Sequence, residues 1–549
     1  MIATKAVGLL AQQVTALRVL TSAGVIRPYS PVVLLQLARA LASWGTGPAG
    51  GFTALALREP DHVGVIDELG ELTFRQLHER SNALARSLRE QGVDAGDSVA
   101  ILCRNHRGFI DASIAVSKLG ADVLYLNTAF AGPQLVDVLA RERPAALVYD
   151  EEFTDLLAGC DVGARILAWN DSGPGDSLTL ERLIAAGSVE DLAPPDRPGR
   201  VVILTSGTTG TPKGAPRTEA GVDAAVALLS RLPLRRGWRT HVAAPLFHTW
   251  GWAHLALAML LGSTLVLRRR FEPEDCLRVV TEHRCDSLVV IPVMLQRILQ
   301  LPSQVLDSYD LSAVKVVAAS GSALPGDLGT TWMDRFGDNL FNVYGSTEVA
   351  WATIARPEDL RAAPGTAGKP PHATVVKLYD ERGEPVAAGG TGRIFVANSL
   401  LFEGYTGDGG SKEMLDGLMS TGDVGRFDDE GRLFVEGRDD EMIVSGGENV
   451  FPTEVEDCLA RHDAVVEVAA LGVDDADFGQ RLRAFVVLTA DGAASEDELK
   501  AHVKAHLARY KVPREIVFLD ELPRNATGKV LKRDLDPGGK ARAAEGKPR

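Results

Sequence analysis

The sequence predicts an α/β protein with a large N-terminal domain of mainly parallel strand-helix subdomains and a small, mobile α+β C-terminal domain. At 549 residues the chain exceeds one hydrophobic core, since domains average ~150 residues. Short apolar strands alternate with helical patterns over residues 54–438, which is typical of parallel sheets covered by helices. After residue 438 the pattern changes to two long strands followed by a helix, which indicates a second domain.

Composition narrows the classes of partner. Hydrophobic residues make up 45% and charged residues 24% of the chain, as in ordinary soluble proteins. The net charge of -15 excludes a broad basic surface for nucleic acid. The five cysteines show no C-x-x-C spacing, so we predict neither a zinc site nor a disulfide framework. With no transmembrane run or signal peptide, we expect a cytoplasmic protein.

The N-terminal segment, residues 1–53, predicts two amphipathic helices. Apolar residues recur at helical spacing on both sides of the Arg27–Pro31 stretch: Leu10, Val14, Leu17, Leu34, Leu37 and Leu41. We expect these faces to pack on the main domain. The alternative is that they contact a membrane surface or a partner subunit, such as a second copy in a homodimer.

The large domain, residues 54–438, carries a loop that suggests phosphate binding. The sequence "LTSGTTGTPKG" begins at Leu204, directly after the apolar strand Val201–Ile203. Glycines let main-chain N–H groups converge on an anion, hydroxyls add donors, and one ammonium offsets phosphate charge. The spacing is not that of a Walker loop. The predicted polyphosphate cradle consists of Thr205, Ser206, Gly207, Thr208, Thr209, Gly210 and Lys213.

The small domain, residues 439–536, contains the strands "VVEVAALGV" and "RAFVVLT" and then a helix. Ser495 with Glu498 three residues later is a capping-box pattern that predicts the start of this helix. The tail, residues 537–549, has no apolar face, so we expect it to be flexible.

Five motifs in this order resemble those of the AMP-forming acyl-CoA synthetases, within the wider group of adenylate-forming enzymes. They are "TSGTTGTPKG", "NVYGSTE", "STGD", "GRDDEMIVSGGENVFPTEVE" and "PRNATGKVLKRDL". The resemblance runs from about residue 72 to 535. It implies an enzyme that uses ATP, Mg²⁺ and coenzyme A.

In the large domain, the resemblance assigns the nucleotide to three of these motifs. Tyr344 would stack on adenine next to Gly345, Thr347 would donate to phosphate or to the substrate carboxylate, and Glu348 would bind Mg²⁺. The ribose hydroxyls would bind Asp423, and Arg438 would be a second nucleotide contact.

In the small domain, the resemblance makes Lys529 the catalytic lysine, which reaches the reacting carboxylate and the α-phosphate. A cation positioned where negative charge develops lowers the barrier to adenylate formation. Asp440 would be the hinge about which the domain turns, and Gly446 and Gly447 would then help admit the thiol of coenzyme A. Taken alone, Lys529 would be one solvated lysine beside Lys532 and Arg533.

The acid substrate is less defined by the sequence. The resemblance places His248, Trp250 and Gly321 in the acyl pocket, although the tryptophan could simply be core. Relatives that activate amino acids carry an aspartate at the position of His248, and an ammonium without a counter-charge is costly to bury. We therefore expect an uncharged acid, first a medium- or long-chain fatty acid and alternatively an aryl acid.

Two other functions remain open at this stage. The adenylate could be transferred to a carrier protein instead of coenzyme A, or the chain could be a non-catalytic relative that binds lipid. The presence of both Glu348 and Lys529 argues against a non-catalytic protein.

Overall fold

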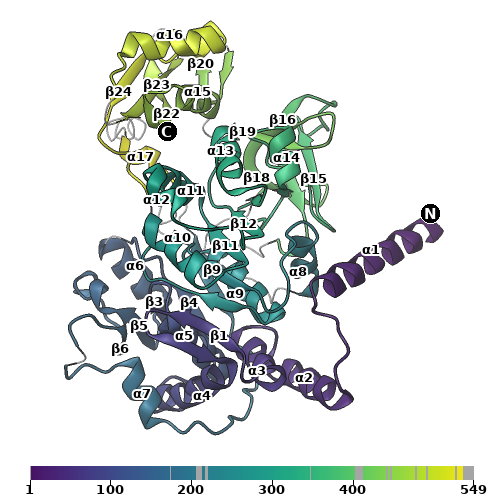
Figure 1. Cartoon of the computed structure of the whole chain (residues 1–549), viewed down its shortest axis with the longest axis vertical. Coiled ribbons are helices and arrows are strands. Elements are labelled where there is room, and N and C mark those ends of the chain that lie inside the picture. Colours follow the sequence, from purple (N-terminus) through teal and green to yellow (C-terminus); the bar gives the residue numbers. More distant parts are fainter. Residues whose placement is uncertain are drawn as a thin grey trace, which may run out of the picture.

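The computed structural model describes residues 2–130, 132–173, 175–205, 213–216, 221–346, 348–401, 412–439, 443–445, 448–475, 479–489, 492–525 and 528–535. The predicted fold class is confirmed: two largely parallel sheets form the body of the large domain, and a small α+β domain follows at one end of the molecule (Figure 1).

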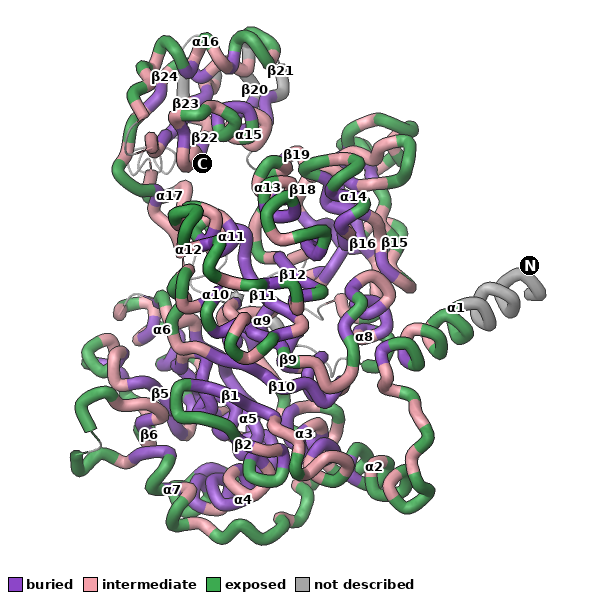
Figure 2. Tube along the Cα trace, viewed as in Figure 1, coloured by how far each residue is buried: buried purple, intermediate pink, exposed green. Residues whose placement is uncertain are grey.

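The N-terminal segment forms three helices, α1 (Ile2–Ser22), α2 (Pro31–Trp44) and α3 (Pro48–Arg58). The expectation that the apolar faces of the first two pack on the main domain is wrong for most of their side chains. Leu17 is 55% exposed and Leu34 is 51% exposed. Among the described side chains of α1, burial begins only near its C-terminal end, with Leu20 and the following Ala23, because this part of the helix projects from the body (Figure 2). The side chain of Leu10 lies outside the described residues.

The larger sheet, sheet A, has eight strands. Its order is β14 (Thr353–Ala355), β13 (Leu340–Tyr344), β12 (Val316–Ala319), β11 (Ser287–Val290), β9 (Arg239–Val242), β10 (Thr264–Val266), β1 (Val63–Asp67) and β2 (Gly70–Thr73). The six inner strands pair in parallel, and the two edge strands are antiparallel to their neighbours. The carboxyl ends of β9, β11, β12 and β13 therefore meet at one edge.

The second sheet, sheet B, has six strands in the order β6 (Ala164–Trp169), β5 (Ala146–Asp150), β3 (Ser98–Leu102), β4 (Asp122–Tyr125), β7 (Val201–Thr205) and β8 (Lys213–Pro216). All pairs are parallel except β7 with β8. One face of sheet B packs with sheet A in a continuous core, and its other face, with Leu102, Leu124 and Leu147, forms a separate cluster.

The helices of the large domain connect these strands. They are α4 (Phe74–Glu90), α5 (Arg107–Leu119), α6 (Gly132–Glu142), α7 (Leu180–Ala186), α8 (Val222–Leu229), α9 (Thr249–Leu261), α10 (Pro273–Glu282), α11 (Pro292–Leu299), α12 (Ser303–Asp307), α13 (Gly326–Phe336) and α14 (Pro357–Ala362). The start of α4 follows from its sequence, since Thr73 and Gln76 cap each other reciprocally. No helix in the described part of the chain is long and apolar enough to cross a membrane.

A third, antiparallel sheet, sheet C, completes the large domain. It contains β15 (Val375–Tyr379), β16 (Thr391–Ala397), β18 (Leu418–Phe427) and β17 (Met414–Leu415), with β19 (Leu433–Arg438) paired to β18. Asp423 lies directly opposite Arg438 in the register of β18 and β19. Sequence spacing did not reveal this pairing.

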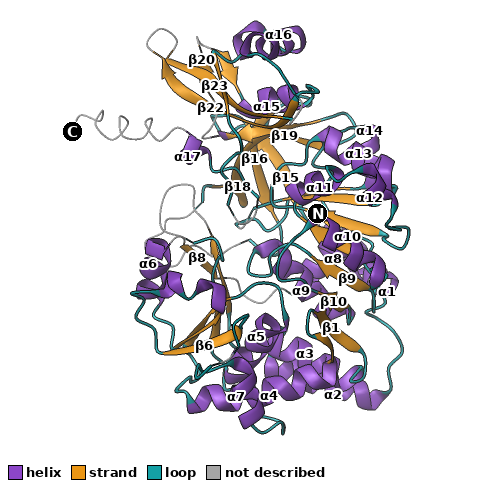
Figure 3. Ribbon diagram, turned by 60° about the vertical axis from the view of Figure 1, so that its left-hand side comes forward, coloured by secondary structure: helices purple, strands orange, loops and turns teal. Residues whose placement is uncertain are grey.

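The small domain has its own sheet, sheet D, and its own core. The strands are β21 (Glu448–Val450), β20 (Ile443–Ser445), β23 (Gly479–Leu488), β22 (Val465–Asp475) and β24 (Glu515–Phe518); the helices are α15 (Pro452–Ala460), α16 (Glu496–His506) and α17 (Lys532–Leu535). Figure 3 shows α15 and α16 beside this sheet. The predicted capping box is present at the start of α16.

Candidate active site

The carboxyl edge of sheet A collects several of the predicted residues. Tyr344 ends β13, Gly321 follows β12, Ile291 follows β11, and His248 lies between β9 and α9. Because these strands are parallel neighbours, the segments after them lie side by side. Open α/β sheets bind ligands at this edge.

Tyr344 and Asp423 are joined by a short hydrogen bond across two sheets. The Tyr344 hydroxyl donates to Asp423 Oδ2 at 2.6 Å and also lies 3.3 Å from Thr421 Oγ1. Arg438 Nη1 lies 3.5 Å from Asp423 Oδ1. The sequence motifs placed all three residues near the nucleotide, and the structure adds that they contact one another.

Burial dominates the electrostatics of this group. The Asp423 side chain is 13% exposed, and its burial raises the pKa of the carboxyl, while the Tyr344 hydroxyl and the charges of Arg438 and Lys529 act in the opposite direction. Burial and the neighbouring carboxylate raise the pKa of Tyr344 well above its usual value. The tyrosine is therefore a neutral hydrogen-bond donor at physiological pH.

The turn after β13 is tightly packed around Gly345. A Cβ at this position would lie 2.2 Å from the carbonyl oxygen of Ala350, so only glycine fits. Ser346 Oγ accepts from the main-chain N–H groups of Glu348 at 3.3 Å and Val349 at 3.4 Å. These bonds fix the half-buried Glu348 at the end of the motif.

Asn398 supports this turn from sheet C. Its Nδ2 donates to the carbonyl oxygens of Val349 at 2.6 Å and Trp351 at 2.8 Å. Neither Ser346 nor Asn398 was predicted from the sequence to contribute to the site. Ser346 stood inside a motif and could have been recognised as a turn-capping hydroxyl, whereas Asn398 carries no sequence signal.

Gly528 and Lys529, together called the lysine turn, are both held by Asn525 through their main chain. Asn525 Oδ1 accepts from the Lys529 N–H at 2.9 Å, and the Asn525 N–H donates to the Lys529 carbonyl at 2.9 Å. The Lys529 side chain is exposed. Its neighbour Lys532 differs, because its Nζ forms an ion pair with Glu456 at 3.0 Å within the small domain.

This turn rests directly on the carboxyl edge of sheet A. Gly528 has φ +75°, and a Cβ there would lie 2.5 Å from Val293 Cγ1 and 3.0 Å from Ile291 Cδ1. Gly321 meets the same isoleucine, since its Cβ would lie 3.3 Å from Ile291 Cγ2. The lysine turn and the segment after β12 thus converge on Ile291.

Two further contacts join the domains in this arrangement. Gln296 Nε2 on α11 donates to the Val466 carbonyl at 2.8 Å, and Arg461 lies 3.7 Å from the Asp327 carboxylate on α13. They hold the small domain against the large one, and in this arrangement the Lys529 charge acts to lower the pKa of Asp423, the predicted ribose ligand.

The predicted acyl-pocket residues have different environments. His248 caps the start of α9, and burial lowers its pKa to about 4, so the imidazole is neutral. Trp250 is 6% exposed and donates from Nε1 to the Val290 carbonyl at 3.1 Å. This tryptophan is therefore packed between α9 and β11, and its assignment to the pocket stays a prediction.

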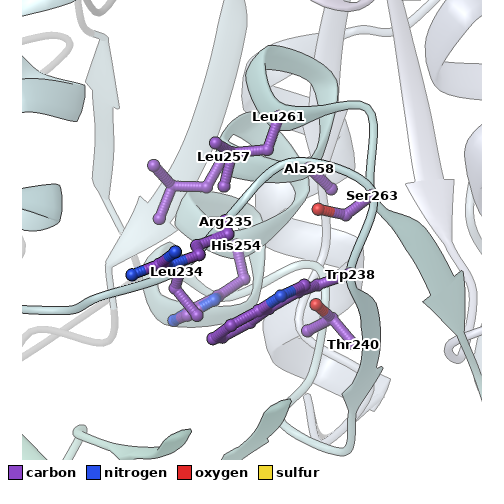
Figure 4. Close-up of a pocket in the computed structure, with 9 residues that line it drawn as sticks. All are labelled: Leu234, Arg235, Trp238, Thr240, His254, Leu257, Ala258, Leu261 and Ser263. Atoms are coloured by element: carbon purple, nitrogen blue, oxygen red, sulfur yellow. The ribbon is translucent and has the colours of Figure 1, made fainter. Parts of the chain in front are cut away.

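A small pocket lies at the opposite end of the strands. Its lining comes from the amino ends of β9 and β10 and from α9: Leu234, Arg235, Trp238, Thr240, His254, Leu257, Ala258, Leu261 and Ser263 (Figure 4). Its free volume of about 10 Å³ matches the room of one water molecule. It is distinct from the predicted acyl pocket.

Several predicted residues lie outside the described residues. They are Ser206, Gly207, Thr208, Thr209, Gly210, Thr347, Asp440, Gly446 and Gly447. The two ends of the predicted phosphate loop are described as main chain: Thr205 and Lys213 face each other in the antiparallel pair of β7 and β8.

Comparison with known proteins identifies the family. The AMP-binding enzyme family matches residues 52–406, and the AMP-binding enzyme C-terminal domain matches residues 454–529. The chain belongs to the AMP-binding enzymes. It is an AMP-forming acid–CoA ligase, which activates a carboxylic acid with ATP through an acyl-AMP.

Similar members of this family are named for aromatic acids. A feruloyl-CoA synthase from Amycolatopsis sp is 34% identical over 84% of this chain and 93% of its own length. An indoleacetate–CoA ligase from Aromatoleum aromaticum is 31% identical over 87% of this chain and 95% of its own length. The crystal structure of the anthranilate CoA ligase AuaEII with anthranoyl-AMP has a TM-score of 0.81 and 26% identity, covering 91% of this chain and 98% of its own.

Proposed function

We propose that this AMP-binding enzyme converts an aryl acid, of the size of a hydroxycinnamate or an indoleacetate, into its CoA thioester. The names of the relatives support the aryl alternative better than the fatty acid that the sequence analysis placed first. The neutral His248 agrees with an uncharged acyl group, because it offers no counter-charge to an amino acid's ammonium.

The observation that carries the proposed mechanism is the position of the Lys529 turn against Ile291 and Val293 at the carboxyl edge of sheet A. From there the ammonium can reach a nucleotide whose ribose hydroxyls donate to Asp423. Tyr344 and Arg438 hold that carboxylate in place, so it needs no reorganisation when ATP binds.

In the first half-reaction, a carboxylate oxygen of the acid attacks the α-phosphorus of ATP. A bond forms between this oxygen and phosphorus, and the bond from phosphorus to pyrophosphate breaks. Lys529 stabilises the negative charge that gathers on the α-phosphate. Thr347 would donate to the same group, and the loop from Thr205 to Lys213 would bind the departing pyrophosphate.

Glu348 fits the role of a magnesium ligand. Its carboxylate is a hard oxygen donor of the kind Mg²⁺ prefers, and Ser346 fixes its main chain at the end of β13. When bound, the ion would neutralise part of the charge on the leaving pyrophosphate.

In the second half-reaction, the sulfur of coenzyme A forms a bond to the acyl carbon, the bond from that carbon to the AMP oxygen breaks, and the thiol proton is lost to solvent. Lys529 is no longer required for this step, so the small domain can turn about Asp440 and bring Gly446 and Gly447 toward the thiol. Closing the site in both states protects the mixed anhydride from water.

The test of the proposed substrate is a comparison of acids at fixed ATP and coenzyme A. We expect kcat/KM for ferulate or indoleacetate to exceed that for octanoate and palmitate by at least about 10-fold, the discrimination that one well-filled apolar pocket provides. AMP release is measured for each acid. A fatty acid with the higher kcat/KM would overturn the aryl assignment while leaving the ligase mechanism intact.

We also infer that the N-terminal helices make peripheral contact with an anionic membrane. Residues 2–44 contain Lys5, Arg18, Arg27 and Arg39 and no acidic residue, although the whole chain carries a net charge of -15. The exposed apolar side chains on α2 are Val32, Leu34, Leu35 and Leu41. Apolar surface next to positive charge is the combination that binds anionic lipid.

Vesicle sedimentation tests this contact. The full chain should sediment with phosphatidylserine-containing vesicles more than with phosphatidylcholine vesicles, and the variant Leu34→Glu/Leu41→Glu should not. If the full chain ignores both vesicles and instead forms a dimer that this variant abolishes, the surface contacts a second copy and the membrane assignment is wrong.

A further inference from the structure

A cluster of soft metal ligands lies on the small domain, away from the residues that bind the nucleotide. It is formed by Cys458 on α15 and by His502 and His506 on α16. One ring nitrogen of each histidine and the cysteine sulfur all lie within 4.8 Å of one another. We propose that this cluster is a site for a divalent transition-metal ion, with Zn²⁺ as the best match.

The spacing of the two histidines suits chelation. They are four residues apart on α16 and so project from the same face of the helix, one turn apart. Their rings are 4.4 Å apart between centroids. Two histidines at this spacing on a helix are a known arrangement for binding zinc, and Cys458 adds a third ligand from the neighbouring helix.

Hydrogen bonds to the main chain orient both rings. His502 Nε2 lies 3.1 Å from the Cys458 carbonyl, and His506 Nδ1 lies 2.8 Å from the His502 carbonyl. A carbonyl oxygen accepts a hydrogen bond only from a nitrogen that carries a proton, so in each neutral ring the lone pair is on the other nitrogen, Nδ1 of His502 and Nε2 of His506. Metal-binding histidines commonly have such a carbonyl partner, because it fixes the tautomer.

His462 is a neighbour of the cluster but not a ligand. Its ring lies edge-on to that of His502, at 5.1 Å between centroids. Its Nδ1 accepts from the Ala464 N–H at 3.2 Å, so the proton of the neutral ring is on Nε2 and no lone pair is available. This histidine therefore provides a matched control.

A second cluster of possible metal ligands lacks the features that a metal site needs. Cys103, His106 and Asp150 are equally close together but fully buried. His106 uses both ring nitrogens, since Nε2 lies 2.8 Å from Asp150 Oδ1 and Nδ1 accepts from the Gly108 N–H at 3.0 Å. Because His106 has no free lone pair and all three residues are buried, we assign this cluster a structural role.

The identity of the ion follows from the ligand atoms. A thiolate with two imidazoles favours Zn²⁺ and similar ions over Mg²⁺ and Ca²⁺, which take oxygen ligands. Zn–S and Zn–N bonds of about 2.3 and 2.0 Å separate the ligands of a tetrahedral site by roughly 3.3–3.6 Å. Two atoms at the 4.8 Å limit would have to approach by about 1 Å, and His506 can move because it is exposed and ends α16.

Binding would join α15 to α16 and leave one coordination position for water. The Cys458 thiol loses its proton to solvent as the sulfur–metal bond forms. Because Arg461, which follows α15, pairs with Asp327 of the large domain, the site adjoins a contact between the two domains.

Cobalt is the spectroscopic probe for this site. Full-length protein without a histidine tag is stripped with a chelator, freed of nucleotide and titrated with Co²⁺. We expect one equivalent to produce a thiolate-to-cobalt charge-transfer band, which Zn²⁺ then removes by displacement. The absence of this band in the wild-type protein would overturn the proposal.

Three variants identify the ligands. Cys458→Ser should lose the charge-transfer band. His506→Ala changes an exposed residue and should fold normally, but its Co²⁺ affinity should fall by more than the ~10- to 100-fold that loss of an outer partner costs. His462→Ala should bind Co²⁺ as the wild type does. A band that persists in Cys458→Ser, or an unchanged affinity in His506→Ala, would refute the assignment.

Discussion

The two domains position the charged groups of the proposed active site in different ways. On the large domain, Asp423 is buried and is fixed through its side chain by Tyr344 and Arg438. On the small domain, Lys529 has an exposed side chain and is positioned through its main chain, by Asn525 and by the contact of Gly528 with Val293.

This difference matches the proposed tasks of the two groups. A ribose ligand is needed in both half-reactions and benefits from a rigid position. A lysine that must approach for one half-reaction and withdraw for the other needs a surface contact that can separate without exposing a hydrophobic core. The glycine contact at Ile291 and Val293 is such a contact, because it is formed by a single turn.

The largest effect is expected from removal of the Lys529 ammonium group. Lys529→Ala should lower the rate of adenylate formation by about 10²- to 10³-fold, while thioester formation from supplied acyl-AMP is much less affected. Pyrophosphate release measures adenylate formation, and CoA-dependent AMP release from supplied acyl-AMP measures thioester formation. Lys504→Ala, an exposed lysine on α16, is the control, and equal loss of both halves in Lys529→Ala would contradict the role.

The rigid side is tested at Asp423. Asp423→Asn removes the charge that accepts from the ribose and leaves Arg438 without its carboxylate. Hydrogen bonds to charged groups contribute about 1.5–3 kcal/mol, so KM for ATP should rise by roughly 10- to 100-fold. Unlike Lys529→Ala, this variant should impair both half-reactions, because AMP is bound in each.

The same residue predicts a pH dependence. Burial raises the pKa of Asp423. As the pH falls, its carboxylate therefore becomes protonated at a higher pH than that of an ordinary aspartate. Nucleotide binding through the charged form is present above this raised pKa and is lost as the pH falls through it. When KM for ATP is measured at decreasing pH, it should rise in the wild type as Asp423 becomes protonated. This rise should be missing in Asp423→Asn.

The contact between the two sides is tested at Gly528. An alanine there must adopt a left-handed conformation, which costs about 1–2 kcal/mol, and its Cβ would overlap Val293. Gly528→Ala should slow adenylate formation by roughly 10-fold and spare the second half-reaction. Adding Val293→Ala removes the overlap and should restore part of the rate; no restoration would show that the contact does not position the lysine.

The smallest effect is expected at Tyr344. Tyr344→Phe removes only the hydroxyl that donates to Asp423, and one hydrogen bond contributes about 0.5–1.5 kcal/mol. KM for ATP should rise by roughly 2- to 10-fold, with little change in the ratio of the two half-reactions. A loss as large as that of Asp423→Asn would mean that the tyrosine does more than hold the carboxylate.

Local patterns were sufficient to predict much of the fold. The strand that became β7, the two strands that became β22 and β23, and the capping box of α16 all follow from short-range spacing. The first two N-terminal helices were also predicted, but neither α3 nor the exposure of Leu17 and Leu34 was. A helical pattern shows that a face is apolar, and it cannot show what covers that face.

The sequence by itself determined the family and the reaction, because these are encoded in short ordered motifs, and the same motifs predict the residues of the site. Only the tertiary structure decided which of these residues touch: Tyr344 with Asp423 is a contact across 79 positions, and the lysine turn meets Val293 across more than 200. The cluster of Cys458 with His502 lies beyond sequence patterns for the same reason, since its ligands come from two helices that only packing brings together.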